Sequence, residues 1–201
     1  MTNSKTRMTT DIRQEQIIET AMKIINNSGF LSLTTRALAD EIGVSEPALY
    51  RHFINKDEII LGIIRKMEYL WTEVEKELNQ QEDPLKKLLL FIEMHFDYIN
   101  QNPNIIAVLF ADEYIRWNSL VGNYLQEIQS KRYEYLEQLL DEGCRKLSFK
   151  KLNTGITAMI ILGTIRSTIL SWRNANYQFS LPEYSGQVLH TISLMITKDN
   201  Q

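Results

Sequence analysis

The chain has little cysteine, histidine, proline or glycine. Its one cysteine, Cys144, cannot form an intramolecular disulfide, which excludes a small disulfide-stapled secreted scaffold and favours a reducing, cytoplasmic location. Its histidines, His52, His95 and His190, lack metal-ligand spacing, and the chain has neither a glycine-rich phosphate loop nor a Gly-x-Ser-x-Gly nucleophile motif. We therefore expect no bound metal, no cofactor and no catalytic residue, and interpret the protein as not an enzyme.

Long apolar runs and an excess of positive charge are also absent. No uncharged run exceeds 14 residues, fewer than the roughly 18 that suggest a membrane span, and the first ten residues lack the apolar core of a signal peptide. We expect no membrane partner, and interpret residues 152–165 as a buried helix. With 22 Lys and Arg against 25 Asp and Glu, the net charge is -3, so nucleic-acid binding needs a local motif.

Apolar residues recur every three or four positions along most of the chain, whereas the alternation typical of strands is rare. With only four Pro and eight Gly to interrupt it, this pattern predicts an all-α fold of about nine helices. Turn and cap signals, including a capping box at Asn55 and Glu58, place the helices at residues 10–28, 35–42, 46–53, 55–78, 84–101, 104–114, 120–147, 153–175 and 182–197. We expect an N-terminal three-helix domain, residues 1–55, and a larger helical domain, residues 56–201.

Residues 38–49 have the pattern of a helix-turn-helix. Gly43 suits the positive φ angle of a tight turn, and the apolar residues around it supply a shared core. Ser45 is placed to cap the second helix, and Pro47 fits its first turn, where a backbone N–H has no helical partner. This geometry presents the start of the second helix to the major groove of DNA.

The run from Leu38 to Ile59, LADEIGVSEPALYRHFINKDEI, is similar to the DNA-binding signature of the TetR family of transcriptional regulators. The resemblance covers residues 10–60, and over the rest of the chain it extends to the number, length and order of helices. It implies phosphate contacts from Thr35, Arg36, Tyr50, His52 and Lys56. It further implies that four residues lie on or beside base edges: Ser45, Glu46, Pro47 and Ala48.

By the same resemblance, residues 56–201 form a ligand-binding and dimerisation domain. The function implied is a homodimeric repressor that binds a palindromic double-stranded DNA operator and is released by a small-molecule effector of unknown identity. The alternative is a DNA-binding adaptor whose C-terminal domain recruits a protein partner. An apolar cavity favours the first function, and an exposed apolar patch beside a filled core favours the second.

The expected base readout is sparse. The exposed turn of the recognition helix has no Arg, Asn or Gln for a bidentate base contact, so DNA shape is expected to carry much of the specificity. Residues 1–60 contain seven Lys and Arg against eight Asp and Glu, which argues against strong nonspecific binding. Lys5 and Arg7 fit either an arm in the minor groove or a solvated tail.

Two interpretations stay open for the aromatic and polar residues of the larger domain. His95 shares a stripe with Ile92 and Ile99, as either a hydrogen-bonded core histidine or a ligand contact. Arg166 fits either an anionic effector or an ion pair. The other candidates either fill the core or line an effector pocket with these two: Phe91, Phe96, Phe110, Trp117 and Met159.

The last two predicted helices carry more apolar residues than a terminal pair needs in a monomer. A four-helix dimer interface resembles the family arrangement and spaces two recognition helices about 34 Å apart on DNA. An intrachain helix pair is the alternative. The residues expected at the dimer interface are Ala158, Ile161, Ile165, Leu189, Ile192 and Ile196.

Overall fold

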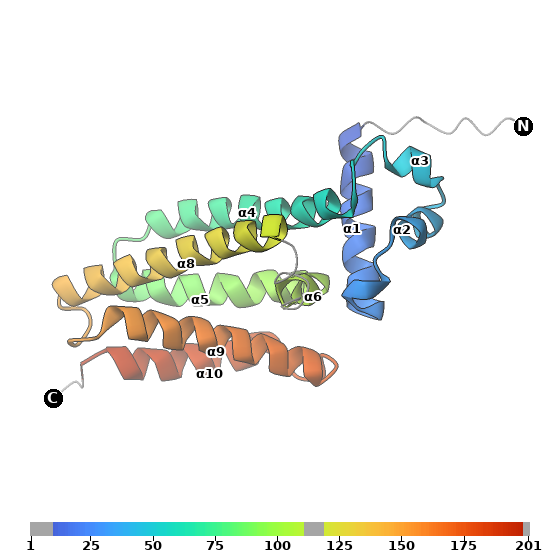
Figure 1. The fold of residues 1–201 in the computed structure, drawn as a ribbon. Helices are drawn as coiled ribbons and strands as arrows, with labels where there is room; N and C mark the ends of the chain where they lie inside the picture. Colours follow the sequence, from blue (N-terminus) through green and yellow to red (C-terminus); the bar gives the residue numbers. More distant parts are fainter. Residues whose placement is uncertain (1–9, 111–118, 199–201) are drawn as a thin grey trace, which may run out of the picture. The chain divides into compact units, whose positions relative to one another are not determined.

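The computed structural model describes residues 10–110 and 119–198, which contain helices and no strand, so the predicted all-α class is confirmed (Figure 1). Short 3-10 turns occur at Phe30–Ser32 and Pro103–Ile105. The α-helices are α1 (Thr10–Ser28), α2 (Thr35–Ile42), α3 (Glu46–Leu49), α4 (Lys56–Asn79), α5 (Pro84–Gln101), α6 (Ile106–Leu109), α8 (Ser119–Arg145), α9 (Thr154–Asn174) and α10 (Leu181–Ile196).

Most helix ends lie within two residues of their predicted positions because side chains cap them. Asp83 accepts a hydrogen bond from the N–H of Leu85 at the start of α5, at 2.9 Å. At the start of α4, Asn55 accepts from the N–H of Glu58 at 2.9 Å, and the Glu58 carboxylate accepts from the N–H of Ile54 at 2.5 Å. The predicted capping box is thus confirmed, with its return bond made one residue earlier than in the standard motif.

Two helices differ from prediction. The helix expected at residues 46–53 ends at Leu49, after which the His52 N–H donates to the Leu49 carbonyl at 2.9 Å in a tight turn. That turn leads Phe53 into the core, where it is 7% exposed. The helix expected at residues 104–114 begins as a 3-10 turn at Pro103 and continues as α6, and its predicted end lies outside the described residues.

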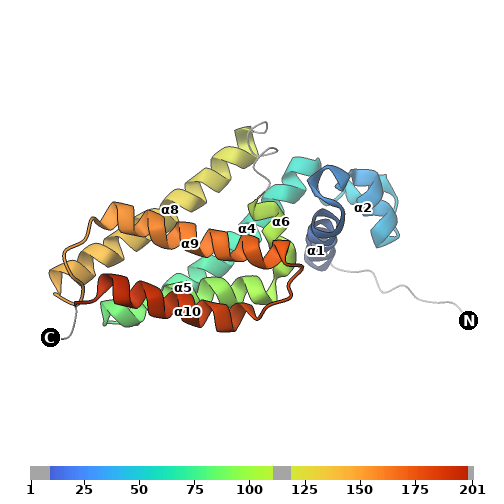
Figure 2. The ribbon, with the colours of Figure 1, turned by 90° about the horizontal axis from the view of Figure 1, so that it is seen from below.

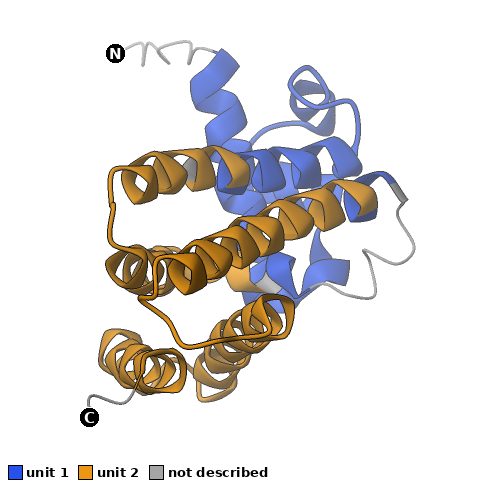
Figure 3. Ribbon diagram, turned by 90° about the vertical axis from the view of Figure 1, so that its left-hand side faces the viewer, with its two compact units in different colours: residues 1–67, 107–122 blue, residues 68–106, 123–201 orange. Residues whose placement is uncertain are grey.

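The chain divides into two compact units, of which the first contains residues 1–67 and 107–122 (Figure 3). In this unit α1 packs against α2, and α2 packs against α3. The α-helix α4 continues from the first unit, up to Met67, into the second. The boundary at residue 55 between two functional domains stays a prediction. The core of the first unit includes Ile17, Ala21, Ile25, Leu38, Leu49 and Ile63, each at most 1% exposed.

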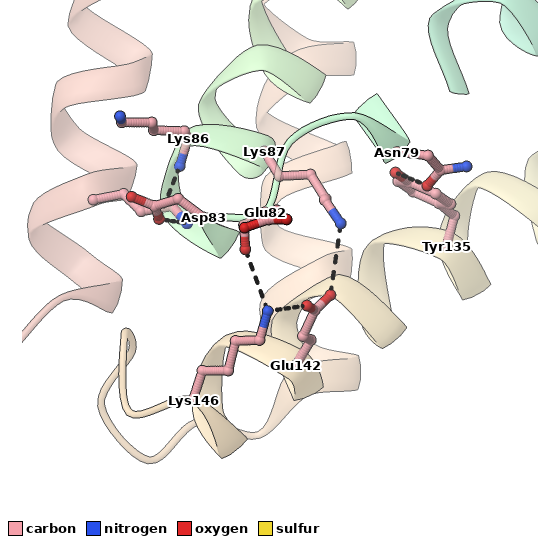
Figure 4. Close-up of polar contacts among 9 residues, drawn as sticks. Asn79, Glu82, Asp83, Lys86, Lys87, Tyr135, Glu142 and Lys146 are labelled. Carbon is pink, nitrogen blue, oxygen red and sulfur yellow. Dashed lines mark hydrogen bonds and ion pairs between the residues drawn. The ribbon is translucent and has the colours of Figure 1, made fainter. Parts of the chain in front are cut away.

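The second unit contains residues 68–106 and 123–201. Its α5 packs along α10 and also contacts α9, and α9 and α10 lie side by side (Figures 1 and 2). Lys146, which directly follows α8, fixes the connection between α4 and α5, since it donates to the carbonyl of Glu82 at 3.2 Å and pairs with Glu142 at 2.7 Å (Figure 4).

The helix α9 is apolar on more than one side. Among the helices of the described chain, it alone is long and apolar enough to cross a membrane, with a mean hydropathy of 1.3. Core helices of soluble proteins also meet this criterion of length and composition. Only 28% of its most apolar window is buried. The prediction of a buried helix therefore holds for one face alone, because Ile156, Met159 and Ile160 are 52%, 60% and 45% exposed.

Candidate functional site

The first unit contains the predicted helix-turn-helix. Gly43 ends α2 with φ 76° and ψ 39°, a left-handed conformation that glycine adopts without strain. The N–H of Val44 donates to the Ala39 carbonyl at 2.9 Å, which closes the turn. Leu38 and Leu49 are at most 1% exposed. The turn and its core therefore form as the sequence predicts.

The first turn of α3 is partly exposed to solvent. Ser45 occupies the N-cap position with an extended backbone, but its side chain makes no capping hydrogen bond, contrary to expectation. Ser45 and Pro47 are exposed, whereas Glu46 and Ala48 are half-buried. The Ser45 hydroxyl is thus not used by the helix, and it lies on the face predicted to meet base edges.

A hydrogen-bond network joins α2 to α3. The Thr35 hydroxyl donates to a carboxylate oxygen of Glu46 at 2.8 Å, and the Tyr50 hydroxyl donates to the Thr35 oxygen at 3.4 Å. Tyr50 is 47% exposed, and Arg36 beside Thr35 is exposed. The structure therefore brings together three predicted DNA contacts, and one of them is a carboxylate.

The remaining predicted phosphate contacts lie before and at the start of α4. His52 is held through its carbonyl, which accepts from the Gln14 side chain at 3.1 Å, while its buried Nδ1 has no partner among the described residues. The Lys56 ammonium lies 5.4 Å from the centre of the Phe30 ring. Burial lowers the pKa of Lys56, an effect that Asp57 opposes. Lys56 is also the first residue of α4, and the free N–H groups at the start of a helix favour an anion.

The second unit contains an aromatic cluster around His95. The imidazole centre lies 4.5 Å from the Phe91 ring and 5.3 Å from the Trp71 ring, and Tyr135 stacks on Phe91 at 6.1 Å. His95 Nδ1 lies 2.7 Å from the Phe91 carbonyl, which only accepts, so this nitrogen carries the proton. Burial, assisted by the charge of Arg132, lowers the pKa of His95 to about 4. The ring is therefore neutral at pH 7.

Arg132 of α8 also belongs to this cluster and was not among the predicted site residues. Its guanidinium carbon lies 5.3 Å from the centre of the Trp71 ring, and its buried Nε has no hydrogen-bond partner among the described residues. Burial lowers its pKa to about 10, so it stays charged at pH 7. A signal existed in the sequence, because Arg132 continues the apolar stripe of Leu125 and Ile128, both buried.

The other predicted pocket residues are dispersed. Phe96 is 1% exposed and fills the core, whereas Met159 is 60% exposed and so lines no interior pocket of a single chain. Arg166 is half-buried on α9, and Phe110 is half-buried in the first unit. Trp117 lies outside the described residues.

The predicted dimer residues also need revision. Ala158, Ile161, Ile165, Ile192 and Ile196 are each at most 5% exposed within one chain, and Leu189 is half-buried. Their apolar character is explained by packing of α9 and α10 inside the second unit. These residues therefore no longer indicate a dimer interface, and the exposed faces of α9 and α10 are the remaining candidates.

An open groove of about 800 Å³ lies between α4 and α5 and was not predicted. Its rim carries four carboxylates, from Glu73, Glu77, Glu93 and Asp97, against one ammonium from Lys76, which pairs with Glu73 at 2.7 Å. The groove is therefore acidic. No group of three or more His, Cys, Asp or Glu side chains suited to a metal ion occurs in the described part of the chain.

Comparison with known proteins assigns both parts of the chain. Residues 17–63 match the family model of bacterial regulatory proteins of the tetR family, and residues 63–196 match the model of the C-terminal region of YsiA-like proteins. The fatty acid metabolism regulator protein of Bacillus subtilis is 25% identical over 179 residues, which are 88% of this chain and 92% of that protein. The nucleoid occlusion factor SlmA of Alteromonas mediterranea is 32% identical over 148 residues, 72% of this chain and 71% of that protein.

The fold has a similar solved counterpart. The crystal structure of the transcriptional regulator FadR from Bacillus subtilis in complex with stearoyl-CoA superposes with a TM-score of 0.77, at 25% identity, over 89% of this chain and 97% of that one. These relatives are named as regulators or as a nucleoid occlusion factor, and the two family models together extend from the helix-turn-helix through α10. The chain belongs to the TetR family of DNA-binding transcriptional regulators.

Proposed function

We propose that the protein is a cytoplasmic, homodimeric repressor that binds a palindromic DNA operator and releases it when a small molecule occupies the second unit. The observation that carries the DNA-binding part is the network of Thr35, Glu46 and Tyr50, which joins the start of α2 to both ends of α3. Hydroxyl groups at this position suit phosphate oxygens on either side of a recognition helix in the major groove.

The proposed effector is a fatty acyl compound. This choice is supported by two names: the Bacillus subtilis relative is called a fatty acid metabolism regulator, and the similar Bacillus subtilis crystal structure is a complex with stearoyl-CoA. The aromatic cluster around His95 supplies apolar ring faces in the second unit. A ligand changes DNA affinity only if it binds one conformation of the protein more tightly than the other.

The helix α4 is the proposed lever between the two functions. It begins at Lys56 and is one continuous α-helix to Asn79, so its first turn carries a predicted phosphate contact and its second half carries Trp71 of the aromatic cluster. An effector that shifts the second half of α4 would change the separation of the two recognition helices in a dimer. Spin labels on the two recognition helices of the dimer measure their separation. The same separation with and without effector would exclude this lever.

The proposed dimer interface lies on the exposed faces of α9 and α10. Ile156, Met159, Ile160 and Gly163 follow one another at helical spacing on α9, and Leu194 and Met195 are 62% and 46% exposed on α10. Exposed apolar side chains grouped in this way are typical of a protein–protein interface. A small residue such as Gly163 permits close approach of a second helix.

The test of the effector proposal uses a fluorescently labelled operator duplex obtained by selection from random DNA. We expect stearoyl-CoA, added below its micellar concentration, to lower the fluorescence anisotropy of the complex, and free coenzyme A to leave it unchanged. Full retention of the duplex both at saturating stearoyl-CoA and at saturating stearate would contradict a fatty acyl effector.

A second function, the protein-recruiting adaptor, is favoured by the groove between α4 and α5. Its four carboxylates and open shape suit a basic peptide segment rather than an anionic metabolite. If the protein binds operator DNA but no fatty acyl compound releases it, this function becomes the better one. A partner captured by the wild type and lost in a Glu93→Lys, Asp97→Lys double variant would then support it.

A further inference from the structure

Arg132 is a cation whose buried Nε has no partner among the described residues. It lies on α8 over the Trp71 ring of α4, and no ion pair or hydrogen bond of its guanidinium occurs in the part of the chain that the structure describes. Arginine has five N–H donors and no acceptor, so a buried donor left unpaired is unfavourable. A cation–π contact with one ring offsets only part of the loss of hydration.

Glu68, the carboxylate whose charge acts on Arg132, is already engaged. One of its carboxylate oxygens accepts from the Tyr124 hydroxyl, and the other lies 3.4 Å from the Lys131 ammonium. Glu68 affects Arg132 only through its charge at longer range. The protein therefore satisfies this carboxylate with Lys131 and Tyr124 and leaves the buried Nε of Arg132 without a bond.

Among the described residues, the other titratable groups beside Arg132, His95 and Tyr98, supply no negative charge at pH 7. His95 is neutral, and burial raises the pKa of Tyr98 to about 12, so its hydroxyl keeps its proton. Trp71 and Phe91 contribute aromatic rings to this cluster, and their ring centres lie 5.5 Å apart in an edge-to-face arrangement. The cluster is thus a single positive charge set among aromatic rings, which suits a molecule that has both an oxyanion and an apolar part.

We propose that Arg132 binds an oxyanion, a carboxylate or a phosphate, of the effector, and that the apolar part of the effector lies against Trp71 and its neighbouring rings. This proposal rests on the proposed effector function and specifies the chemistry of its site. A guanidinium forms paired hydrogen bonds with either oxyanion, and the bound anion would remove the deficit at Nε.

The test compares the full chain, freed of copurified lipid, with Arg132→Met and with Arg145→Met. Arg145 is an exposed residue of the same helix and is the matched control. The probes are stearate, stearoyl-CoA and octadecanol, which share an eighteen-carbon chain and carry a carboxylate, phosphates or no charge. Binding is measured by Trp fluorescence and by the shift in melting temperature.

We expect stearate or stearoyl-CoA, but not octadecanol, to raise the melting temperature of the wild type and of Arg145→Met. In Arg132→Met the affinity for that anion should fall roughly tenfold to a hundredfold, the range for a lost hydrogen bond to a charged group. Which of the two anions binds distinguishes a carboxylate from a phosphate. An Arg132→Lys variant, which keeps the charge without the planar fork, should lie between the two.

The stability of the ligand-free variants separates binding from structure. Because Met removes a buried unpaired charge and keeps a long apolar side chain, ligand-free Arg132→Met should melt at or above the wild-type temperature. A lower melting temperature together with unchanged affinity would overturn the proposal and make Arg132 a structural residue. Wild-type affinity in Arg132→Met overturns it while the effector function stands. If none of the probes binds and none releases operator DNA, both proposals fail.

Discussion

Glu46 places a negative charge on the surface that is predicted to approach DNA. Its carboxylate accepts a hydrogen bond from Thr35, which orients it beside two hydroxyl groups suited to phosphate. A carboxylate there repels phosphates wherever no base donor compensates it. We infer that Glu46 acts mainly against incorrect DNA sequences, a form of specificity that attractive contacts alone do not give.

The variant Glu46→Gln tests this inference. Glutamine still accepts the Thr35 hydrogen bond but lacks the charge, so affinity for DNA of arbitrary sequence should rise roughly fivefold, equivalent to about 1 kcal/mol for one charge pair in water. The charge-matched control is Glu41→Gln, at an exposed position of α2, and it should change the affinity for DNA of arbitrary sequence less. Anisotropy titrations with a random duplex measure the affinity of both variants. If Glu46→Gln binds this duplex no more tightly than the wild type, Glu46 does not act against incorrect DNA sequences.

His95 makes the stability of the second unit depend on pH. Its pKa is about 4 in the folded chain and 6.5 when unperturbed, so the unfolded chain takes up a proton that the folded chain does not. The stabilisation from neutral His95 is complete above pH 6.5 and is lost as the pH falls toward 4. By linkage, the free energy of unfolding should decrease by roughly 2 kcal/mol between pH 7 and pH 5.

His95→Gln isolates this contribution because all other titrating groups are unchanged. Urea unfolding of wild type and variant at both pH values gives the difference directly. We expect a smaller decrease for the variant, and the same decrease in both proteins would show that His95 does not titrate as described.

Helix-capping residues, together with apolar residues at helical spacing, were enough to predict most helices. Asn55, Asp83 and Asn153 each cap the helix that follows them, because their side chains accept bonds from its first N–H groups. The end of α3 at Leu49 was not predictable, since burial of Phe53 interrupts a pattern that still looks helical. The unpaired state of Arg132 depends on contacts among three helices, which no local pattern contains.

Gly143 shows how a helix position can depend on residues that follow the end of its own helix. A Cβ at Gly143 would lie 2.0 Å from Cε2 and 2.1 Å from Cδ2 of Phe149, whose side chain is 1% exposed. The Phe149 N–H also donates to the Gly143 carbonyl at 3.1 Å. The end of α8 and the residues after it are thus folded tightly onto this glycine.

We expect Gly143→Ala to lower the free energy of unfolding by about 1–3 kcal/mol, although alanine normally favours a helix. The control is Gly186→Ala on α10, where a Cβ meets no atom within 4 Å and stability should rise by up to about 1 kcal/mol. Chemical denaturation measures both variants. A Gly143→Ala protein as stable as the wild type would mean that the Phe149 ring moves aside at little cost.

At the scale of the whole molecule, the sequence could not tell which face of α9 meets a partner. The helix is apolar on opposite sides, so its sequence pattern alone suits Ile161 and Ile165 for an interface as well as Met159 and Ile160. Only packing distinguishes them: α9 packs against α5 and α10, and in this unit Ile161 and Ile165 are buried whereas Met159 and Ile160 are exposed. The same ambiguity placed Met159 among the pocket candidates.

The proposed interface predicts the behaviour of a charged variant. Met159→Glu places a carboxylate at an exposed position, so each chain should stay folded but sediment as a monomer, and operator affinity should fall at least about a hundredfold with the loss of one half-site. Leu31→Glu, at a position 89% exposed in the first unit, should remain dimeric. A dimeric Met159→Glu protein in analytical ultracentrifugation would exclude this face.

Operator binding is tested most directly by selecting bound sequences from random double-stranded DNA with the purified protein. The selection is done at roughly physiological salt, where nonspecific phosphate binding is weakened. A dimeric helix-turn-helix regulator should enrich a palindrome with half-sites about one helical turn apart. A well-folded dimer that enriches no sequence would contradict operator binding, and the function would then have to be sought in the acidic groove between α4 and α5.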